Sequence, residues 1–310
     1  MDIRQIQYFI RVYEERSFSR AAERANVVQP ALSMQIRRLE EELKTSLFDR
    51  TPKGIEPTIS GDRLYQLCLP IVHGIADARR EIMELGNGTR VAGSLRVGMP
   101  PSVNRGILGQ VLSEYADSYP NVDVTVTEAY SDGLTALVQQ GALDLALGAA
   151  PNVNTGLSHR IALRDTLMLV SKHPVNGEPL SPCRLRDLRD FKLIVPPRQT
   201  FLGATIYTYI ASGELKPSRT MEIEGVTATL ELARASEWVT IFPYISMRRD
   251  IRENGFHVYP IIDPPMNFNL YFVFDPSRPL TAASRAFSEM LEAALQQVDC
   301  DRNALLGERS

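Results

Sequence analysis

The segment QPALSMQIRRLEEEL, Gln29–Leu43, decides how the N-terminal part of the chain folds. Its apolar residues recur at spacings of 4, 3 and 4: Leu32, Ile36, Leu39 and Leu43. This is the period of an α-helix with one buried face. The opposite face carries polar or flexible side chains: Ser33, Met34, Arg37 and Arg38. The segment alone leaves open whether this second face contacts another molecule or is only solvated, with its charges in helix-surface ion pairs.

The flanking segments complete a small domain over residues 1–57. Apolar residues from Ile3 to Tyr13 predict an amphipathic helix, and Ser19 is placed to cap a second, short helix, RAAERA. After the third helix, SLFDRTPKGIEPT has two extended pieces around Pro52-Lys53-Gly54, which predict a hairpin. Two helices, a tight turn, a third helix and a hairpin with a basic tip make a winged helix-turn-helix, a fold that binds DNA.

In such a domain the third helix reaches base edges with the side chains of its N-terminal turns. Ser33 can bond either kind of base, whereas Met34 can make only apolar contacts, such as one with a thymine methyl group. Four cations would hold phosphates: Arg37, Arg38, Arg50 and Lys53. Residues 1–90 contain 14 Lys and Arg against 13 Asp and Glu, so DNA contact would depend on these local cations and not on a diffuse field.

A long linker helix and a hinge are predicted over residues 58–90. The apolar spacing there alternates between 4 and 3: Leu64, Cys68, Ile71, Ile75, Ala78, Ile82 and Leu85. This seam could pack on a second copy of the chain or on its own domain. Pro70 should kink the helix or weaken its first half. The stretch GNGTRVAG, Gly86–Gly93, is rich in glycine and polar residues and predicts a domain boundary.

Residues 91–310 alternate between strand and helix patterns, which predicts an α/β domain with mainly parallel sheets. The length favours two lobes facing across a cleft, with ligand at the carboxyl ends of the strands. We expect lobe I at about 91–162 and 269–300 and lobe II at about 163–268. In LRVGMPPSV a strand ends and a helix begins, so backbone N–H groups and Ser102 could hold an anion. Helix capping is the alternative role for Ser102 and for Ser131.

The composition and the absence of motifs exclude several other classes of protein. With 44% hydrophobic and 23% charged residues, the chain is typical of a globular protein. No apolar run reaches the roughly 18 residues of a membrane span. The N-terminus is charged and has no secretory core, so we expect a cytoplasmic protein without a membrane partner. The three cysteines form no CxxC, and P-loop, GxGxxG, GxSxG and HExxH motifs are absent. We therefore expect no metal, no cofactor and no enzymatic activity.

The stretch SFSRAAERANVVQPALSMQIRRLEEELKTSLFDRTPKGIEPTISG closely resembles the N-terminal signature of LysR-type transcriptional regulators. The matching features are AA in the second helix, QPALS, I-x-x-L-E-x-E-L, LF-x-R, the wing glycine and T-x-x-G. The resemblance extends over essentially the whole chain. It implies a winged helix-turn-helix, a long linker helix and a two-lobed effector domain similar to periplasmic binding proteins. It also implies a homodimer or homotetramer formed through the linker helix, with double-stranded operator DNA, a small effector and RNA polymerase as partners.

Carried over position by position, the family's DNA contacts fall on eight residues: Gln29, Pro30, Ser33, Met34, Arg37, Arg38, Arg50 and Lys53. Two positions depart from the family pattern. Val28 stands where Ser or Thr is common, so Gln29 must supply the helix cap instead. Met34 stands where a polar residue able to bond a base is frequent.

The family's effector contacts fall on three loops: Pro101, Ser102, Val103, Ser131, Arg198, Thr200 and Phe201. On facing loops, these residues favour a ligand with an apolar body and a polar or carboxylate end. Arg198 could pair with that carboxylate or could equally be a solvated loop arginine. We therefore expect a DNA-binding transcription regulator that responds to a small effector, and we expect that effector to be a carboxylate. The alternative is a small-molecule binding protein whose N-terminal domain does not function.

Overall fold

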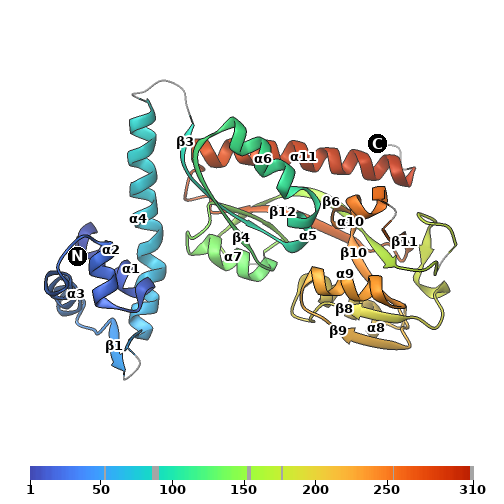
Figure 1. Ribbon diagram of the computed structural model, residues 1–310, viewed down its shortest axis with the longest axis horizontal. Coiled ribbons are helices and arrows are strands. Elements are labelled where there is room, and N and C mark those ends of the chain that lie inside the picture. The colour runs from blue at the N-terminus through green and yellow to red at the C-terminus, as the bar shows by residue number, and fades with distance from the viewer. Residues whose placement is uncertain (52–53, 86–90, 152–154, 176, 254, 308–310) are drawn as a thin grey trace. The chain divides into compact units, whose positions relative to one another are not determined.

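The computed structural model describes residues 1–51, 55–85, 91–151, 155–175, 177–253 and 255–307, together with the backbone of Gly54. The chain divides into two compact units, Met1–Thr89 with Gln140–Ala142 and Arg90–Gln139 with Leu143–Ser310. Each unit is described by itself below (Figure 1).

The first unit is a winged helix-turn-helix followed by a long helix, as the sequence predicts. Its elements, in chain order, are α1 (Ile3–Glu15), α2 (Phe18–Arg24), α3 (Gln29–Leu43), β1 (Phe48–Thr51), β2 (Gly54–Pro57) and α4 (Ile59–Leu85). Strands β1 and β2 pair antiparallel and form the wing. The expectation that Ser19 caps the second helix is wrong. Ser17 is the cap, because α2 begins at Phe18 and the Ser17 hydroxyl accepts a hydrogen bond from the Arg20 N–H at 3.4 Å.

Helix α3 buries a shorter stripe than its sequence predicts. Leu32, Ile36 and Leu39 are at most 1% exposed, whereas Leu43 is 37% exposed. The reason is that the helix ends there: Lys44 takes the left-handed conformation that terminates it. The expected cap by Gln29 is also wrong. Val28 occupies the cap position without a side-chain bond, and the Gln29 amide donates to the Ser33 hydroxyl at 3.2 Å.

Helix α4 divides its seam between two environments. Its first half packs on the helix-turn-helix core through a set of apolar side chains: Leu64, Tyr65, Cys68, Leu69 and Val72. Further along, Ile71, Ile75 and Ile82 are 48%, 40% and 69% exposed. The alternative that the seam packs on its own domain therefore holds for the first half only. Pro70 lies inside α4 without ending it, and the kink or weakening expected there stays a prediction.

The second unit has two lobes that share one sheet, in the strand order β4-β3-β5-β12-β6-β10-β8-β9. The first lobe contains β3 (Ala92–Met99), α5 (Pro101–Val103), a π-helical turn (Asn104–Leu108), α6 (Gly109–Ser118), β4 (Asn121–Glu128), α7 (Ser131–Gln139) and β5 (Leu145–Gly148). The second contains β7 (Cys183–Arg184), a 3-10 turn (Leu185–Asp187), β8 (Lys192–Val195), α8 (Phe201–Ala211), β9 (Arg219–Glu222), α9 (Val226–Ala235), β10 (Trp238–Pro243), α10 (Tyr244–Glu253) and β11 (His257–Asp263).

Two long strands join the lobes: β6 (Ser158–Ser171) and β12 (Asn267–Phe274). They pair antiparallel with each other, and β6 also pairs antiparallel with β10 and β11. Pairing inside the lobes is parallel, β3 with β4 and β5 and β8 with β9 and β10. The expectation of mainly parallel sheets is therefore right within each lobe and wrong where the lobes join, because a strand shared by two lobes returns antiparallel. We propose that the lobe boundaries fall within these two strands.

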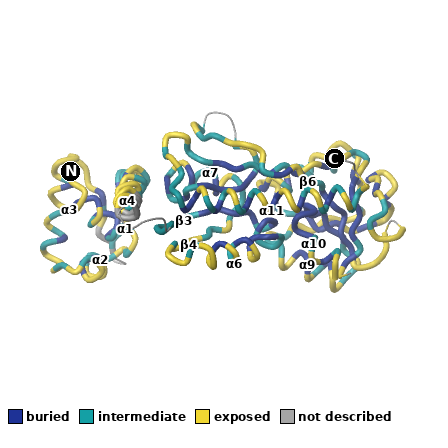
Figure 2. The backbone as a smooth tube through the Cα atoms, turned by 90° about the horizontal axis from the view of Figure 1, so that it is seen from above, coloured by how far each residue is buried: buried dark blue, intermediate teal, exposed yellow. Residues whose placement is uncertain are grey.

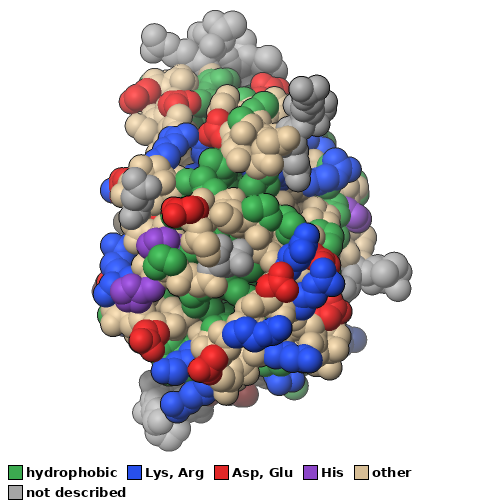
Figure 3. All heavy atoms as spheres, turned by 90° about the vertical axis from the view of Figure 1, so that its right-hand side faces the viewer, with side chains coloured by type: hydrophobic (Ala, Val, Ile, Leu, Met, Phe, Trp, Pro, Cys, Tyr) green, Lys and Arg blue, Asp and Glu red, His purple; other side chains and the backbone are tan. Residues whose placement is uncertain are grey.

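The core of the second unit follows this sheet. Figure 2 shows buried residues concentrated along the strands and the inner faces of the helices. Helix α11 (Ala282–Leu306) packs on lobe I through Phe287, Leu291 and Leu295. At the far end of lobe II, basic side chains are interspersed with acidic ones (Figure 3). Two ion pairs of this unit, Arg186–Asp263 and Arg252–Asp301, join elements distant in sequence.

Candidate functional site

The predicted base-reading residues lie together on the exposed face of α3. Five of the six predicted residues on this helix are exposed: Gln29, Pro30, Met34, Arg37 and Arg38. The sixth, Ser33, is half-buried and bonded to Gln29. Met34 presents 49% of its surface, so the apolar side chain that departs from the family pattern is accessible.

The cations near this face differ in whether an acidic side chain of the same domain pairs with them. Arg37 pairs with Glu41 one turn further along α3, at 2.9 Å. Arg38 has no ion-pair partner in the described part of the chain, so its charge is available to a phosphate. Only the backbone of Arg50 is described, in β1, and Lys53 lies outside the described residues.

Glu40 fixes the wing relative to α3, a role that the sequence pattern did not reveal. Its carboxylate accepts hydrogen bonds from the N–H groups of Leu47 and Phe48, at 2.7 and 3.4 Å. The Thr58 hydroxyl donates to the Ser46 carbonyl at 2.7 Å and so ties the start of α4 to the same turn. The I-x-x-L-E run was visible in the sequence, but which backbone its glutamate reaches depends on the tertiary fold.

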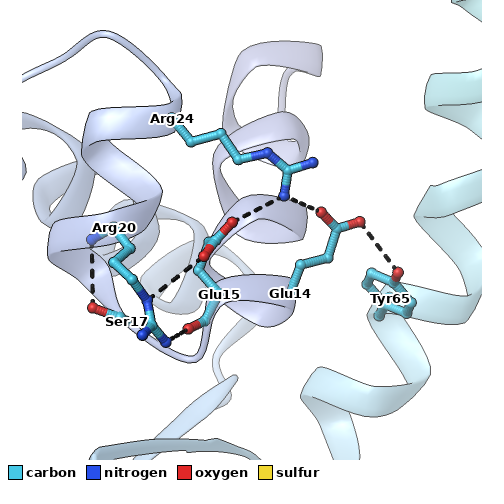
Figure 4. A network of polar contacts seen from close by, with 6 residues as sticks. All are labelled: Glu14, Glu15, Ser17, Arg20, Arg24 and Tyr65. Atoms are coloured by element: carbon cyan, nitrogen blue, oxygen red, sulfur yellow. Dashed lines mark hydrogen bonds and ion pairs between the residues drawn. The ribbon is translucent and has the colours of Figure 1, made fainter.

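A polar network joins α1 and α2 to α4 (Figure 4). Glu14 accepts from Arg24 at 2.7 Å and from the Tyr65 hydroxyl at 3.4 Å, and Glu15 contacts both Arg24 and Arg20. Burial, and after it the charge of Glu14, raises the pKa of Tyr65 to about 12. The two arginines of α2 are thus both paired with glutamates of α1.

The second unit contains a largely apolar cavity between its lobes, at the carboxyl ends of β3, β8 and β10. Its volume is about 70 Å³. Its walls come from both lobes: Pro100, Pro101, Ser102, Tyr130, Ser131, Pro196, Thr200, Phe201, Leu202, Ile223, Gly225, Val226, Thr229, Thr240, Ile241, Phe242, Pro243 and Phe268. None of the described residues that line it is charged.

The structure brings five of the seven predicted effector residues to this cavity: Pro101, Ser102, Ser131, Thr200 and Phe201. Phe201 packs against Phe268, with ring centroids 5.6 Å apart. The other two are corrections. Val103 is fully buried in the core behind the wall, because it follows Ser102 on the inner side of α5. Arg198 is exposed outside the cavity, where its guanidinium stacks 3.9 Å from the Tyr207 ring centroid.

The hydroxyls in the cavity wall are bonded in distinct ways. Thr200 caps α8, accepting from Gly203 N–H at 3.0 Å while donating to the Pro197 carbonyl at 2.8 Å. Ser131 does not cap its own helix but accepts from Ala149 N–H at 2.9 Å. Ser102 lies inside α5, is 8% exposed, and has no hydrogen-bond partner among the described residues. The capping alternative is therefore wrong for both serines.

Most of the remaining cavity wall was missed by sequence reasoning. The missed polar side chains are Tyr130, Thr229 and Thr240, and the missed aromatic ones include Phe242 and Phe268. They come from the connection before α7 and from α9, β10 and β12, far apart in the sequence, and no local motif connects them. The repeated strand ends followed by Pro or Gly were the one available signal, since ligands in α/β folds bind there.

A winged helix-turn-helix with an exposed third helix, followed in the chain by a two-lobed binding domain, defines a DNA-binding transcription regulator with a ligand domain. Two family models match: bacterial regulatory helix-turn-helix protein, lysR family, over residues 3–62, and LysR substrate binding domain, over residues 88–296. The chain belongs to the LysR family of transcription regulators, which are not enzymes. Among the helices in the described ranges, none combines the length and apolar character that a bilayer span requires.

Individual relatives are similar along most of their length. The HTH-type transcriptional regulator BenM of Acinetobacter baylyi is 25% identical over 269 residues, covering 85% of this chain and 86% of the relative. A full-length OxyR variant from Pseudomonas aeruginosa has the same fold, with a TM-score of 0.73 at 19% identity over 96% of this chain and 95% of its own. Full-length CbnR in complex with its target DNA matches with a TM-score of 0.67 at 22% identity, covering 95% and 100%.

Proposed function

We propose that this regulator reads an operator through the N-terminal half of α3 and changes its DNA binding when a small effector occupies the cavity between its lobes. The single observation that carries the proposal is the exposed Gln29–Arg38 face on a helix whose opposite face is buried in a winged helix-turn-helix core. In this arrangement Ser33 and Met34 would contact bases and Arg38 a phosphate.

The proposal is tested by gel shift against the DNA upstream of the protein's own gene. We expect binding that prefers that DNA over an unrelated duplex and weakens as salt increases. Ser33→Ala should relax base discrimination at one position, at a cost of about 1–3 kcal/mol. Binding indifferent to both sequence and salt would favour the alternative, a small-molecule binding protein whose N-terminal domain does not function.

For the effector we propose a small molecule with an apolar body and one polar end, because the cavity wall is mainly apolar and its polar groups are hydroxyls. A carboxylate is the end expected from the sequence, with Ser102 as its support. Its expected cationic partner, Arg198, lies outside the cavity. Ser102→Ala should blunt the effector response and leave DNA binding intact.

We also propose that the chain acts in the cytoplasm as a homodimer or homotetramer that contacts RNA polymerase at its promoters. The oligomer is supported by the apolar side chains exposed along one face of α4: Leu67, Ile71, Ile75, Ala78 and Ile82. An apolar stripe of this kind is costly to leave in water and is typical of a helix-helix interface.

A further inference from the structure

We infer that the effector of this protein is an amine, an apolar molecule whose ammonium group is held at the mouth of the cavity by Ser102, Glu128 and Glu224. The inference rests on the proposed effector role of the cavity and names the chemical class of the molecule. Three observations carry it: the charge of the mouth, the hydrogen-bonding state of the wall hydroxyls and the unpartnered hydroxyl of Ser102.

The mouth of the cavity is acidic. An outer cleft beside the cavity is lined in part by Asn104, Arg105, Glu128, Tyr130 and Glu224, and the two share Pro101, Tyr130, Gly225 and Val226 in their walls. Both glutamates are exposed, and both contribute by charge to raising the pKa of Tyr130, after burial, which is the largest cause. Since Tyr130 lines the cavity as well as the outer cleft, these carboxylates lie close to the entrance.

The one cation that lines the outer cleft among the described residues is already paired. Arg105 lies 2.6 Å from the Asp250 carboxylate and also donates to the Ser246 carbonyl. A carboxylate ligand would therefore pass two like charges and enter a cavity without a cation, where an unpaired ion is costly to bury. An ammonium group at the mouth meets two opposite charges while its apolar body fills the cavity.

Three threonine hydroxyls in the cavity wall can accept hydrogen bonds from a ligand. The hydroxyls of Thr200, Thr229 and Thr240 donate to the carbonyls of Pro197, Gly225 and Ile194, at distances of 2.8, 2.9 and 3.2 Å. Their protons are thus committed to the backbone, and a ligand would find mainly lone pairs on them. A ligand that donates hydrogen bonds fits these groups, whereas a carboxylate can only accept.

Ser102 is the buried polar group left for the ligand itself. It is 8% exposed, lines the cavity and follows Pro101, which lines both the cavity and the outer cleft. Its hydroxyl has no hydrogen-bond partner among the described residues, so an ammonium donating to it would satisfy the oxygen. Glu128 accepts from the Asn104 amide through one oxygen, which leaves the other for the ligand.

The test uses the full-length chain and three probes of equal length: 2-phenylethylamine, 2-phenylethanol and phenylacetate. Affinities are measured by calorimetry and checked by thermal shift. We expect phenylethylamine to bind about tenfold more tightly than phenylacetate, with phenylethanol in between, as expected for one partly exposed charge contact. Glu224→Gln and Glu128→Gln should each weaken phenylethylamine several-fold and leave phenylethanol nearly unchanged, and Ser102→Ala should weaken both.

Glu231→Gln is the matched control, because Glu231 is exposed on α9 away from both linings and should leave all three affinities unchanged. Phenylacetate binding as tightly as phenylethylamine, or a preference for the amine that survives both glutamate changes, would overturn the inference. Failure of phenylethylamine to bind at all would overturn it too. The gel shift with operator DNA is independent of these probes, so a wrong effector class and a wrong proposed function give different results.

Discussion

Gly61 shows how a single residue can position a whole helix. A Cβ atom built on Gly61 would lie 2.2 Å from the Leu47 carbonyl oxygen, closer than atoms can approach. The Gly61 N–H also bonds the Thr58 hydroxyl at 3.0 Å. The T-x-x-G signature therefore combines a helix cap with a close approach of two backbones at the base of the wing.

We predict that Gly61→Ala destabilises the first unit by about 1–3 kcal/mol, because the backbone of α4 must move away from Leu47. Operator affinity should fall together with stability, because Leu47 lies directly before the first strand of the wing. Urea unfolding and gel shift measure both effects. Gly74→Ala in the same helix is the control: its Cβ would meet nothing within 4 Å, and alanine should stabilise the helix by about 0.5–1 kcal/mol. Equal effects of the two changes would exclude the close approach as the cause.

Asp165 makes the stability of the second unit depend on pH. It is 1% exposed on β6 and accepts from the N–H groups of Thr166 and Ile245, at 2.8 and 2.9 Å. Burial raises the pKa of this carboxyl to about 7 in spite of those two donors. Between about pH 4 and pH 7 the folded state therefore holds a proton that the unfolded state has lost.

We predict that the free energy of unfolding falls as pH rises from about 4 to about 7, and that Asp165→Asn flattens this slope because the amide resembles the protonated carboxyl. Urea titrations of both proteins across this range provide the measurement. Asp117→Asn, at an exposed position on α6, should leave the slope unchanged. A slope that persists in Asp165→Asn would assign the pH dependence to other groups.

Single residues were predictable where their environment is local. The exposed face of α3 followed from helical periodicity, because its burial depends on residues three and four positions away. Two failures at this scale depend on the fold: Glu40 reaches the wing, and Arg198 turns outward onto Tyr207. The third is local, because the Gln29 amide bonds Ser33 one turn further along the same helix and does not cap it.

At the scale of elements, α4 is the helix whose two halves serve different partners. Aromatic side chains anchor the first half: Tyr65 stacks on Tyr13 with ring centroids 3.9 Å apart, and the Tyr13 hydroxyl donates to Asp62 at 2.9 Å. The exposed face carries the apolar stripe of Leu67, Ile71, Ile75, Ala78 and Ile82, which begins in the first half and continues through the second. The sequence seam could not separate these halves, because the same 4–3 spacing serves packing within a domain and between chains.

We predict that Ile75→Asp dissociates the oligomer, because the substitution places a charge in the centre of the proposed apolar interface. Operator affinity should fall as the paired half-sites lose their linkage. Size-exclusion chromatography with light scattering measures the mass. Ile59→Asp is the matched control, since Ile59 is 91% exposed at the start of α4 and lies roughly 120° around the helix from the centre of the stripe. An Ile75→Asp protein of unchanged mass would remove α4 from the interface.

At the scale of the whole molecule, the sequence predicted architecture better than it predicted the site. Alternating strand and helix patterns indicated two α/β lobes, and those patterns are local. The antiparallel joint of β6 and β12 was not predicted, because the return of the chain between lobes is set by pairing between residues more than a hundred positions apart. The cavity depends on the pairing of these two strands. Phe268 of β12 lies opposite Asp165 of β6 in the sheet, and its side chain forms part of the cavity wall.

An ion pair at the outer cleft connects the two lobes. Arg105 belongs to the π-helical turn of lobe I, and its partner Asp250, which is 5% exposed, belongs to α10 of lobe II. Arg234 is the only other cation within ion-pair distance of Asp250 in the described residues, at 3.7 Å. Without Arg105, the buried Asp250 carboxylate would keep only the longer contact with Arg234.

We predict that Arg105→Met lowers the stability of the second unit by roughly 2 kcal/mol, less than the 3–5 kcal/mol of a fully buried pair because Arg105 is partly exposed and Arg234 remains. Thermal unfolding should show a lower transition for this unit alone. The control is Arg249→Met on α10, the helix that carries Asp250. It breaks an exposed ion pair with Glu253 and should lower the free energy of unfolding by less than about 0.5 kcal/mol. If the two changes cost the same, the lobes are held together by the shared strands and not by this ion pair. The junction would then be a property of the sheet, and its geometry would be insensitive to any single side chain at the cleft.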